Sequence, residues 1–568
     1  MQNFSNRLLQ LAEAHPQKTV LNVLQTGQKD IHLTYRDLLQ GAAKYTGALA
    51  ERSIKPGEVV ILILQQGVDL FLSYFGAVLN GSVPSIMPFL TEKLLPEKYR
   101  KDLVALIDIT RPSAIITYRE FAGELEDIQK DNPCIKTVLY VEDIRDLPER
   151  TGLIFRGLAC DPQDIVLLQH SSGTTGLQKG VALSHRAVFN QLDEYAKRLQ
   201  ISPQDVIVSW LPLYHDMGLI ACFILPILYD IPLVIMSPFD WVRAPYRLFQ
   251  AITIYKGTLC WLPNFAYNFC AQKIRPSDLE GVDLSSLRAV SNCSEPMRYA
   301  SHQLFLERFK PYGLRDSAIA TCYAMAENVF AVTQDGIEKR VTYDEIDQEI
   351  FQKDELAQKV NNGERTVVMV SAGKPLENTR VRIVDEKGHE LPERHLGEII
   401  LQSNCMLSGY YHREDATKNA MLGGWFKTGD LGYLADGELY ISGRRKDLII
   451  VGGKNVYPQD IESVVNDIEG VHPGRNVAFG VFNEERGTEE VVVIAELEAG
   501  FEDQSQAISG RIRQQVTQST AVALRSVYLV NGFWLIKTSS GKIARTANKE
   551  KYLAEIAQQE KRNNRQAC

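Results

Sequence analysis

The sequence predicts an α/β protein in which a large, layered N-terminal part is followed by a small α+β part that begins near Lys446. Short β-rich runs alternate with stretches whose apolar residues recur at helical spacing, which is typical of helices layered on parallel sheet. From about Gly388 the pattern changes to short strands with tight glycine turns. At 568 residues the chain is longer than one hydrophobic core usually serves, so we expect two or more domains.

The elements of the N-terminal part follow from this alternation. Met1–Thr19 lacks the uninterrupted apolar run of a signal peptide and is expected to form a short amphipathic helix. Glu58–Leu64 is β-rich, Gly67–Gly81 has helical spacing, and Ser82–Leu90 is extended again. Further strands are expected within Ser113–Tyr118, Lys136–Val141, Asp205–Leu213, Pro232–Met236 and Leu287–Cys293.

Two segments need a separate interpretation. Leu219–Met236 is apolar enough to suggest a membrane span, but Pro226 and Asp230 interrupt it. We therefore expect a buried helix, a turn and a buried strand there, and no membrane span. Gln334–Arg365 is unusually charged and is expected to be an insertion on the surface rather than part of the core.

The composition excludes some classes of function. The 62 basic and 70 acidic residues give a net charge of −8, which argues against a nucleic-acid binder. The nine cysteines form no C-x-x-C pair and no regular framework, which indicates reduced thiols in a cytoplasmic protein. The ten histidines show no zinc-like spacing, so no structural metal is expected.

A loop rich in glycine and hydroxyl groups, Ser171–Lys179, is the strongest local feature. Its sequence SSGTTGLQK suits an anion, because glycines let backbone N–H groups converge and hydroxyls add donors. The spacing is not that of a Walker-type P-loop, since Leu177 and Gln178 separate Gly176 from the lysine. We therefore predict a phosphate-binding loop of another class.

Six stretches stand in a fixed order along the chain: HSSGTTGLQKG, WLPLYHDMG, CYAMAEN, GWFKTGDLGYL, GRRKDLIIVGGKNVYPQDIE and IKTSSGKIART. Together they resemble the adenylate-forming enzymes, which comprise acyl-CoA synthetases, fatty acyl-AMP ligases, adenylation domains and luciferases. The resemblance covers roughly Phe4 to Lys551. It implies a large N-terminal domain over residues 1–445 and a small, mobile C-terminal domain over residues 446–568.

The resemblance also implies the reaction. In this family a substrate carboxylate attacks the α-phosphate of ATP, which gives an acyl-adenylate and pyrophosphate, with Mg²⁺ as the metal. The corresponding loop wraps the β- and γ-phosphates, which suits donors that hold an anion and later release it. The loop residues to which this role is carried over are Ser171, Ser172, Gly173, Thr174, Thr175, Gly176 and Lys179.

Five further positions match residues with a role in the family. Glu327 resembles the magnesium-binding glutamate, and Mg²⁺ prefers a carboxylate together with phosphate oxygens. Asp430 resembles the aspartate that accepts from both ribose hydroxyls, and Arg444 resembles its basic neighbour. Lys542 matches the lysine that bridges the substrate carboxylate and the α-phosphate, whereas Lys446 matches the hinge between the two domains.

The adenine side of the nucleotide pocket is expected at two strand ends. The stretch SNCSEP stands where the family has a loop against adenine, and the stretch YAM ends a second strand. Ala324 departs from the glycine that members often carry there. The residues predicted to bind the nucleotide here are Ser294, Glu295, Tyr323, Ala324 and Met325.

The acyl side is dominated by apolar and aromatic residues. No Asp or Arg is placed to pair with an amino group, so a fatty acid or another hydrophobic carboxylic acid is the expected substrate. His215 resembles the family's gate between the ATP and acyl pockets, and plain packing is the alternative. The predicted pocket residues are Trp210, His215, Trp261, Phe265 and Tyr267.

The acceptor of the acyl group is left open between two thiols. The stretches look most like fatty acyl-AMP ligases, which deliver to the phosphopantetheine of an acyl carrier protein, and Gln334–Arg365 has the length and position of their extra segment. An acyl-CoA synthetase is the alternative. A non-catalytic binding protein is a second alternative, against which the presence of Glu327, Asp430 and Lys542 argues. No residue of the sequence indicates luciferase-like oxygenase chemistry, which is suggested by the fold alone.

Overall fold

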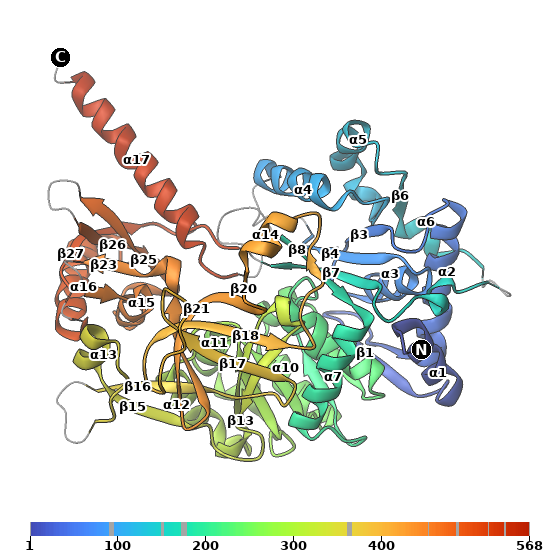
Figure 1. Cartoon of the computed structure of the whole chain (residues 1–568), viewed down its shortest axis with the longest axis horizontal. Coiled ribbons are helices and arrows are strands. Elements are labelled where there is room, and N and C mark those ends of the chain that lie inside the picture. Colours follow the sequence, from blue (N-terminus) through green and yellow to red (C-terminus); the bar gives the residue numbers. More distant parts are fainter. Residues whose placement is uncertain are drawn as a thin grey trace.

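The computed structural model describes residues 2–89, 96–148, 153–171, 179–360, 366–451, 454–483, 488–520, 522–538 and 541–566. Two large sheets with their helices form most of the molecule. The elements after residue 449 gather at one end, and helix α17 (Arg545–Gln566) projects from them (Figure 1). The α/β class expected from the sequence is confirmed, with a large N-terminal and a small C-terminal part.

The first sheet has the order β19-β8-β7-β4-β3-β5-β6. Strands β7, β4, β3, β5 and β6 run parallel, whereas β8 is antiparallel to β7 and β19 to β8. The strands are β3 (Val59–Ile63), β4 (Val83–Met87), β5 (Ala114–Thr117), β6 (Thr137–Tyr140), β7 (Ile165–Ser171), β8 (Lys179–Ser184) and β19 (Gly409–Tyr410).

The second sheet begins with a mostly parallel half. Its order is β2-β1-β10-β9-β11-β12-β13, and only the edge strand β2 runs antiparallel to its neighbour. The strands are β1 (Thr19–Leu24), β2 (Ile31–Thr34), β9 (Ile207–Ser209), β10 (Leu233–Met236), β11 (Leu259–Leu262), β12 (Ala289–Cys293) and β13 (Ile319–Ala324).

The same sheet continues from β13 as an antiparallel half in the order β14-β16-β22-β21-β18-β17, with β15 beside β16 and β20 beside β21. This half carries the glycine-rich turns that the sequence places after Gly388. The strands are β14 (Ala331–Asp335), β15 (Tyr343–Asp347), β16 (Thr366–Pro375), β17 (Thr379–Val384), β18 (Gly397–Ser403), β20 (Met421–Leu422), β21 (Trp425–Ala435) and β22 (Glu438–Arg444).

Helices cover both sheets, and several begin at a side-chain cap. The hydroxyl of Thr34 accepts from the backbone N–H of Asp37, whose carboxylate accepts from the N–H of Thr34 in return. The helices are α1 (Phe4–Ala14), α2 (Tyr35–Glu51), α3 (Val68–Leu79), α4 (Pro96–Thr110), α5 (Ala122–Asp131), α6 (Val141–Arg145), α7 (His185–Leu199), α8 (Leu225–Leu228), α9 (Pro238–Arg243), α10 (Tyr246–Tyr255), α11 (Asn264–Lys273), α12 (Tyr299–Phe309), α13 (Gln348–Asp354) and α14 (Glu414–Asn419).

The strands and helices expected in the N-terminal part are confirmed by this order. The interrupted apolar segment also folds as expected: a π-helix, η3 (Met217–Ile224), leads into α8, a turn follows with Asp230 at φ 59°, and β10 completes it. Within the described ranges, no helix is both long enough and apolar enough to cross a bilayer.

The C-terminal part has a core of its own. Strands β25 and β26 are antiparallel, and β27 runs parallel to β26. Ile461, Ile508 and Ile512 are fully buried between this sheet and its helices. A boundary at Lys446 stays a prediction. The elements are β23 (Ile449–Val451), β24 (Lys454–Val456), β25 (Val471–Asn483), β26 (Thr488–Leu497), β27 (Leu524–Val530), α15 (Pro458–Asn466), α16 (Ser505–Thr520) and α17.

The expectation that Gln334–Arg365 is a surface insertion is wrong for much of that segment. Gln334 lies buried in β14, in the middle of the second sheet, and Ile346 of β15 is fully buried. Phe351 of α13 is 5% exposed and its ring lies 6.3 Å from that of Tyr457. Most of the described charged residues of the segment are exposed, but Asp335 and Asp344 are themselves buried. Residues 361–365 lie outside the described part.

Candidate adenylation site

Asp430 forms the centre of a hydrogen-bonded group on the second sheet. It lies opposite Arg444 in the β21–β22 ladder, and their side chains approach to 3.2 Å. The hydroxyl of Tyr323, at the end of β13, donates to the other carboxylate oxygen at 2.6 Å. Desolvation and then the charge of Asp430 raise the pKa of Tyr323 well above its usual value, so this phenol stays a donor. Three of the predicted nucleotide residues therefore meet at one point.

Glu327 lies just after β13, in the 3-10 turn Ala326–Asn328. The hydroxyl of Tyr410 donates to its Oε1 at 2.8 Å. Desolvation raises the pKa of Glu327 above the ordinary 4.5, with the negative charge of Asp216 adding to the rise, whereas Tyr410 and Arg444 oppose it. The carboxylates of Glu327 and Asp216 repel each other electrostatically in a poorly hydrated place, which favours binding of a cation. The residues present therefore fit Mg²⁺, which takes carboxylate and phosphate oxygens as ligands.

No cluster of three or more His, Cys, Asp or Glu side chains that could hold a metal ion occurs in the described part of the chain. Mg²⁺ is usually bound through one or two carboxylates and the phosphates of the substrate rather than by an all-protein cage. Glu327 is the residue present that would hold such an ion.

Lys179 borders this group from the first sheet. Strand β19 pairs with β8, which places the ring of Tyr410 at 4.5 Å from the Nζ of Lys179. The loop residues Ser172, Gly173, Thr174, Thr175 and Gly176 lie outside the described residues, and Ser171 is described only as the last residue of β7. The loop therefore starts and ends, at Ser171 and Lys179, on the sheet edge next to Tyr410.

Lys542, in the C-terminal part of the chain, acts electrostatically on the same site. Burial alone would raise the pKa of Asp216, but a 3.1 Å contact with Nδ1 of His215 and the positive charge of Lys542 hold it below its usual value. The backbone N–H of Met217 also donates to Asp216 at 2.8 Å. Residues of two separate motifs, His215 and Asp216 in one and Lys542 in the other, thus interact electrostatically.

The adenine-side residues lie at the ends of parallel strands, but they serve different purposes. Ser294 follows β12 with φ 70°, and its hydroxyl lies 3.8 Å from the sulfur of Met217. The carboxylate of Glu295 accepts from the backbone N–H of Phe265 at 2.9 Å, so in this structure it caps the start of α11. Ala324 ends β13, and the N–H of Met325 donates to the carbonyl of Phe330.

The predicted acyl-pocket residues divide into two groups. Trp210 stacks on Trp241 at 3.7 Å, and Phe265, which is 39% exposed, packs edge-on against both indoles. Trp261 is 1% exposed and donates from Nε1 to the hydroxyl of Tyr195 at 2.9 Å. Tyr267 is fully buried and donates to the carbonyl of Val290.

For Trp261 and Tyr267 contact with a substrate stays a prediction, because both side chains are packed in the core. Phe265 presents surface next to the loop that carries His215, since Trp210 begins that loop.

Lys446 lies in a 3-10 turn, Arg445–Asp447, immediately after β22. Partial desolvation, followed by the positive charge of Arg444, lowers its pKa to about 8, and Lys179 contributes in the same direction. The amine of Lys446, the predicted hinge residue, therefore interacts electrostatically with Arg444 and Lys179, which are predicted to bind the nucleotide.

Sequence reasoning missed three residues of the site. Tyr410 carries no recognisable motif, because strand pairing alone brings it to Glu327. Asp216 stood in the quoted stretch WLPLYHDMG but was given no role. Thr428 accepts from the N–H of Asp430 at 3.0 Å and donates to the carbonyl of Ile399, so it fixes the backbone beneath the carboxylate.

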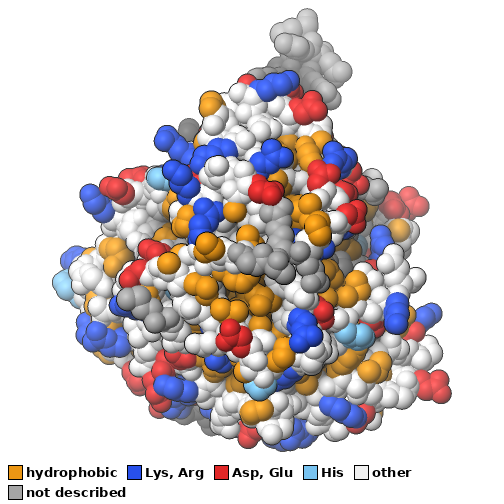
Figure 2. Space-filling view, turned by 90° about the vertical axis from the view of Figure 1, so that its right-hand side faces the viewer, with side chains coloured by type: hydrophobic (Ala, Val, Ile, Leu, Met, Phe, Trp, Pro, Cys, Tyr) orange, Lys and Arg blue, Asp and Glu red, His pale blue; other side chains and the backbone are white. Residues whose placement is uncertain are grey.

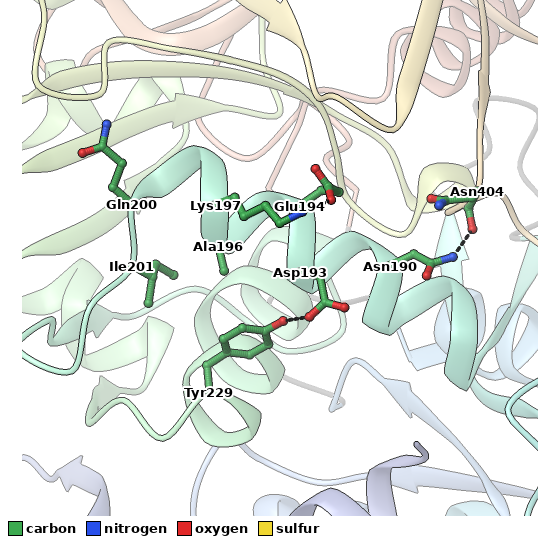
Figure 3. Close-up of a pocket in the computed structure, with 9 residues that line it drawn as sticks. All are labelled: Asn190, Asp193, Glu194, Ala196, Lys197, Gln200, Ile201, Tyr229 and Asn404. Atoms are coloured by element: carbon green, nitrogen blue, oxygen red, sulfur yellow. Dashed lines mark hydrogen bonds and ion pairs between the residues drawn. The ribbon is translucent and has the colours of Figure 1, made fainter. Parts of the chain in front are cut away.

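Two depressions of the surface contain no residue predicted for the site. One, of about 470 Å³, lies along α7, where Tyr229 donates to Asp193 and Asn190 donates to the carbonyl of Asn404 (Figure 3). The other, of about 590 Å³, lies beside β1 and β10 and includes Gln66, whose Oε1 accepts from the N–H of Leu213. This second pocket thus borders the loop that carries His215.

The fold and the site define an adenylate-forming ligase, and enzymes of this class use ATP. The sequence profile of the family described as AMP-binding enzyme matches residues 8–411, more than half of the chain. The chain therefore belongs to the AMP-binding enzyme family.

Relatives with known names agree with this class. The chain is 30% identical to the medium-chain-fatty-acid acyl-carrier-protein ligase JamA of Moorena producens, over 93% of this chain and 91% of the relative. It is 29% identical to a putative acyl-CoA synthetase of Caulobacter vibrioides, over 97% of both chains. A structure from a study of fatty acyl-adenylate ligases of E. coli and L. pneumophila matches 98% of both chains with a TM-score of 0.89 and 27% identity.

Proposed function

We propose that this chain activates a fatty acid, or a similar hydrophobic carboxylic acid, with ATP and Mg²⁺, and passes the acyl group to the phosphopantetheine thiol of an acyl carrier protein. The observation that supports this most strongly is a set of linked charges: Lys542 acts on Asp216, Asp216 and Arg444 act on Glu327, and Arg444 lies 3.2 Å from Asp430. The outermost of these residues, Asp216 and Lys542, stand more than 300 positions apart in the sequence. The fatty acyl ligase relatives support the same substrate class.

The first step is displacement at phosphorus. A carboxylate oxygen of the acid attacks the α-phosphorus of ATP, the bond to the bridging oxygen breaks, and pyrophosphate leaves. The carboxylate is already ionised at neutral pH and needs no base. His215 is therefore assigned to positioning, through its 3.1 Å contact with Asp216, rather than to proton transfer.

The residues divide the work of this step. Asp430, held by Tyr323 and Arg444, accepts from the ribose hydroxyls and fixes the nucleoside. Lys542 stabilises the charge that develops between the carboxylate and the α-phosphate. Lys179 and the loop before it hold the departing phosphates, and Glu327 holds the metal.

The second step is attack of a thiol on the acyl-adenylate. The sulfur adds to the acyl carbonyl, the bond to the phosphate oxygen of AMP breaks, and the thiol proton passes to solvent. We assign the thiol to an acyl carrier protein because JamA is named for that acceptor. CoA stays the alternative acceptor, because the Caulobacter vibrioides relative is named as a putative acyl-CoA synthetase.

The surface charges and the state of the cysteines support proposals about the partners and the compartment of this chain. On the face shown in Figure 2, basic and acidic side chains are intermixed around a central gathering of apolar ones, which supports the proposal that nucleic acid is not a partner. Every described cysteine has a free thiol, which supports the cytoplasm as the compartment.

Product analysis tests the proposal. The purified chain is incubated with MgATP and fatty acids of graded length, without a thiol, with CoA, or with a holo acyl carrier protein, and the products are identified by mass spectrometry. Acyl-AMP without a thiol and acyl-carrier protein with the third mixture support the proposal. Acyl-CoA as the preferred product contradicts the acceptor, and absence of any acyl-AMP contradicts the function.

A further inference from the structure

Arg298 connects the large N-terminal part of the chain to helix α15 of the C-terminal part. Its guanidinium donates to the carbonyl of Gln459 at 2.5 Å and lies 3.4 Å from the carboxylate of Asp460. Both partners stand in the first turn of α15, where a negative side chain is favoured by the helix dipole. The arginine and Asp460 are 30% and 35% exposed, so water screens the pair only partly.

The other side of Arg298 is bound to the ends of β11 and β12. Its backbone N–H donates to Oδ1 of Asn264, the first residue of α11, at 3.1 Å. The same oxygen accepts from Asn292 at 3.0 Å, and Asn292 lies fully buried in β12, two residues before Ser294. Arg298 is therefore fixed by the same strand ends that carry the predicted adenine and acyl residues.

On the C-terminal side, the contact continues to the turn that carries Lys542. Glu462 of α15 accepts from Arg545 at 2.7 Å, and Arg545 also donates to Asp447 at 2.7 Å. Arg545 stands three residues after Lys542. A continuous series of polar contacts thus joins Arg298, α15 and the segment of the lysine.

We propose that Arg298 is a positioning residue for adenylate formation: it holds α15 against the strand ends in the orientation that brings Lys542 to Asp216. This inference rests on the function proposed above and adds to it the residue that sets the geometry of its first step. Arg298 contacts neither ATP nor the acid in this assignment, and acts through Asp460 and Gln459.

The two half-reactions separate this role from a general loss of structure. Pyrophosphate release with MgATP and dodecanoic acid measures the first, and transfer from supplied dodecanoyl-AMP to pantetheine measures the second. We expect Arg298→Ala to slow the first by about ten- to a hundredfold, the range that a displaced catalytic group costs. The second should stay within about twofold, because Lys542 stabilises only the first transition state.

Three further variants define the contact. Arg298→Lys keeps a cation and should recover part of the first half-reaction. Asp460→Asn should slow it less than Arg298→Ala, since the carbonyl of Gln459 still accepts, and the double variant should be no slower than Arg298→Ala. Arg275→Ala removes an exposed arginine paired with Asp278 inside the N-terminal part, and serves as the control.

The proposal is overturned if Arg298→Ala leaves pyrophosphate release unchanged, if it slows both half-reactions equally, or if the effects of the two single variants multiply in the double. Hydrogen exchange of the α15 amides gives a readout without substrate, and it should accelerate in Arg298→Ala but not in Arg275→Ala. If the unmodified chain forms no adenylate, the proposed function fails, and this exchange alone decides the docking role of Arg298.

Discussion

The hydroxyl of Tyr410 donates a 2.8 Å hydrogen bond to Glu327, although 83 positions separate the two residues. The ring of Tyr410 also lies 4.5 Å from the amine of Lys179. One side chain of a two-residue strand, β19, therefore joins the edge of the phosphate loop to the carboxylate assigned to the metal. The position of Tyr410 beside Glu327 therefore depends on the pairing of β19 with β8.

The Tyr410 bond should set the acid side of the pH profile. Glu327 must be ionised to hold a cation, and Tyr410 opposes the rise that desolvation causes in its pKa. Tyr410→Phe removes the donor, so the acid limb of adenylate formation should move to higher pH by up to about one unit, since a hydrogen bond contributes about 1 kcal/mol. Rates of pyrophosphate release against pH measure this. Tyr411→Phe is the control, and an unmoved limb in Tyr410→Phe would refute the assignment.

Glu327→Gln should stabilise the fold while it removes activity. Because the pKa of Glu327 is raised, the folded chain holds the proton more tightly than the unfolded chain, and stability falls as pH rises from 4.5 through the folded value. At neutral pH the neutral amide should therefore raise the melting temperature. Adenylate formation should fall roughly a hundredfold or more, since a metal ion contributes several kcal/mol to the transition state. Glu345→Gln, at an exposed position of β15, should change neither quantity.

Tyr323→Phe should weaken nucleotide binding about fivefold, the factor that matches about 1 kcal/mol for its bond to Asp430. Asp430→Ala should weaken binding further because the ribose acceptor is lost. Calorimetric titration with a non-hydrolysable ATP analogue measures both. Tyr433→Phe removes an equivalent buried bond, from Tyr433 to Asp344 at 2.9 Å, and should reduce stability without changing nucleotide affinity. Equal affinities for Tyr323→Phe and the unmodified chain would contradict the ribose assignment.

Lys446 should react with acetic anhydride near neutral pH. With a pKa of about 8 its amine is half unprotonated at about pH 8, whereas the salt bridge to Glu194 raises the pKa of Lys197 and keeps that amine protonated. Mass spectrometry of the labelled peptides should show faster acetylation of Lys446 than of Lys197, and ATP should slow the reaction at Lys446 only. Equal rates at the two lysines would contradict the lowered pKa of Lys446 and its interaction with Arg444.

Two aromatic residues of the predicted acyl pocket should behave differently. Trp261→Phe removes a buried bond to Tyr195 and part of the core volume, so it should lower the free energy of unfolding by about 1–3 kcal/mol and leave the preference among acids unchanged. Phe265→Ala removes a half-exposed ring and should alter that preference with a smaller effect on stability. Denaturant titration measures the stability, and a panel of fatty acids measures the preference. A changed preference in Trp261→Phe would show that Trp261 lines the acyl pocket.

Much of the fold could be predicted because the strands of the N-terminal part are buried on both faces. Such strands appear as uninterrupted apolar runs, as in Glu58–Leu64, which contains β3. The segment Gln334–Arg365 was interpreted wrongly for the opposite reason. In β15 the exposed Glu345 precedes the buried Ile346, and Asp335 and Asp344 are charged and nevertheless buried, so charged composition does not report burial in this segment.

The site could be predicted only where a motif carried it. Asp430 and Arg444 are neighbours in the ladder and were both named from the sequence, yet nothing in the sequence showed that Tyr323 would donate to the same carboxylate. Tyr410 and the Arg298–Asp460 contact depend on strand pairing and on the packing of α15. Such relationships are set by tertiary structure, which local patterns do not record.

Exchange of labelled pyrophosphate into ATP tests the central claim most directly, because it requires a reversible acyl-adenylate and no thiol. We predict exchange that depends on both Mg²⁺ and a fatty acid, that is absent with amino acids, and that falls about a hundredfold or more in Lys542→Ala. Exchange without a fatty acid, or equal exchange in Lys542→Ala, would contradict the account.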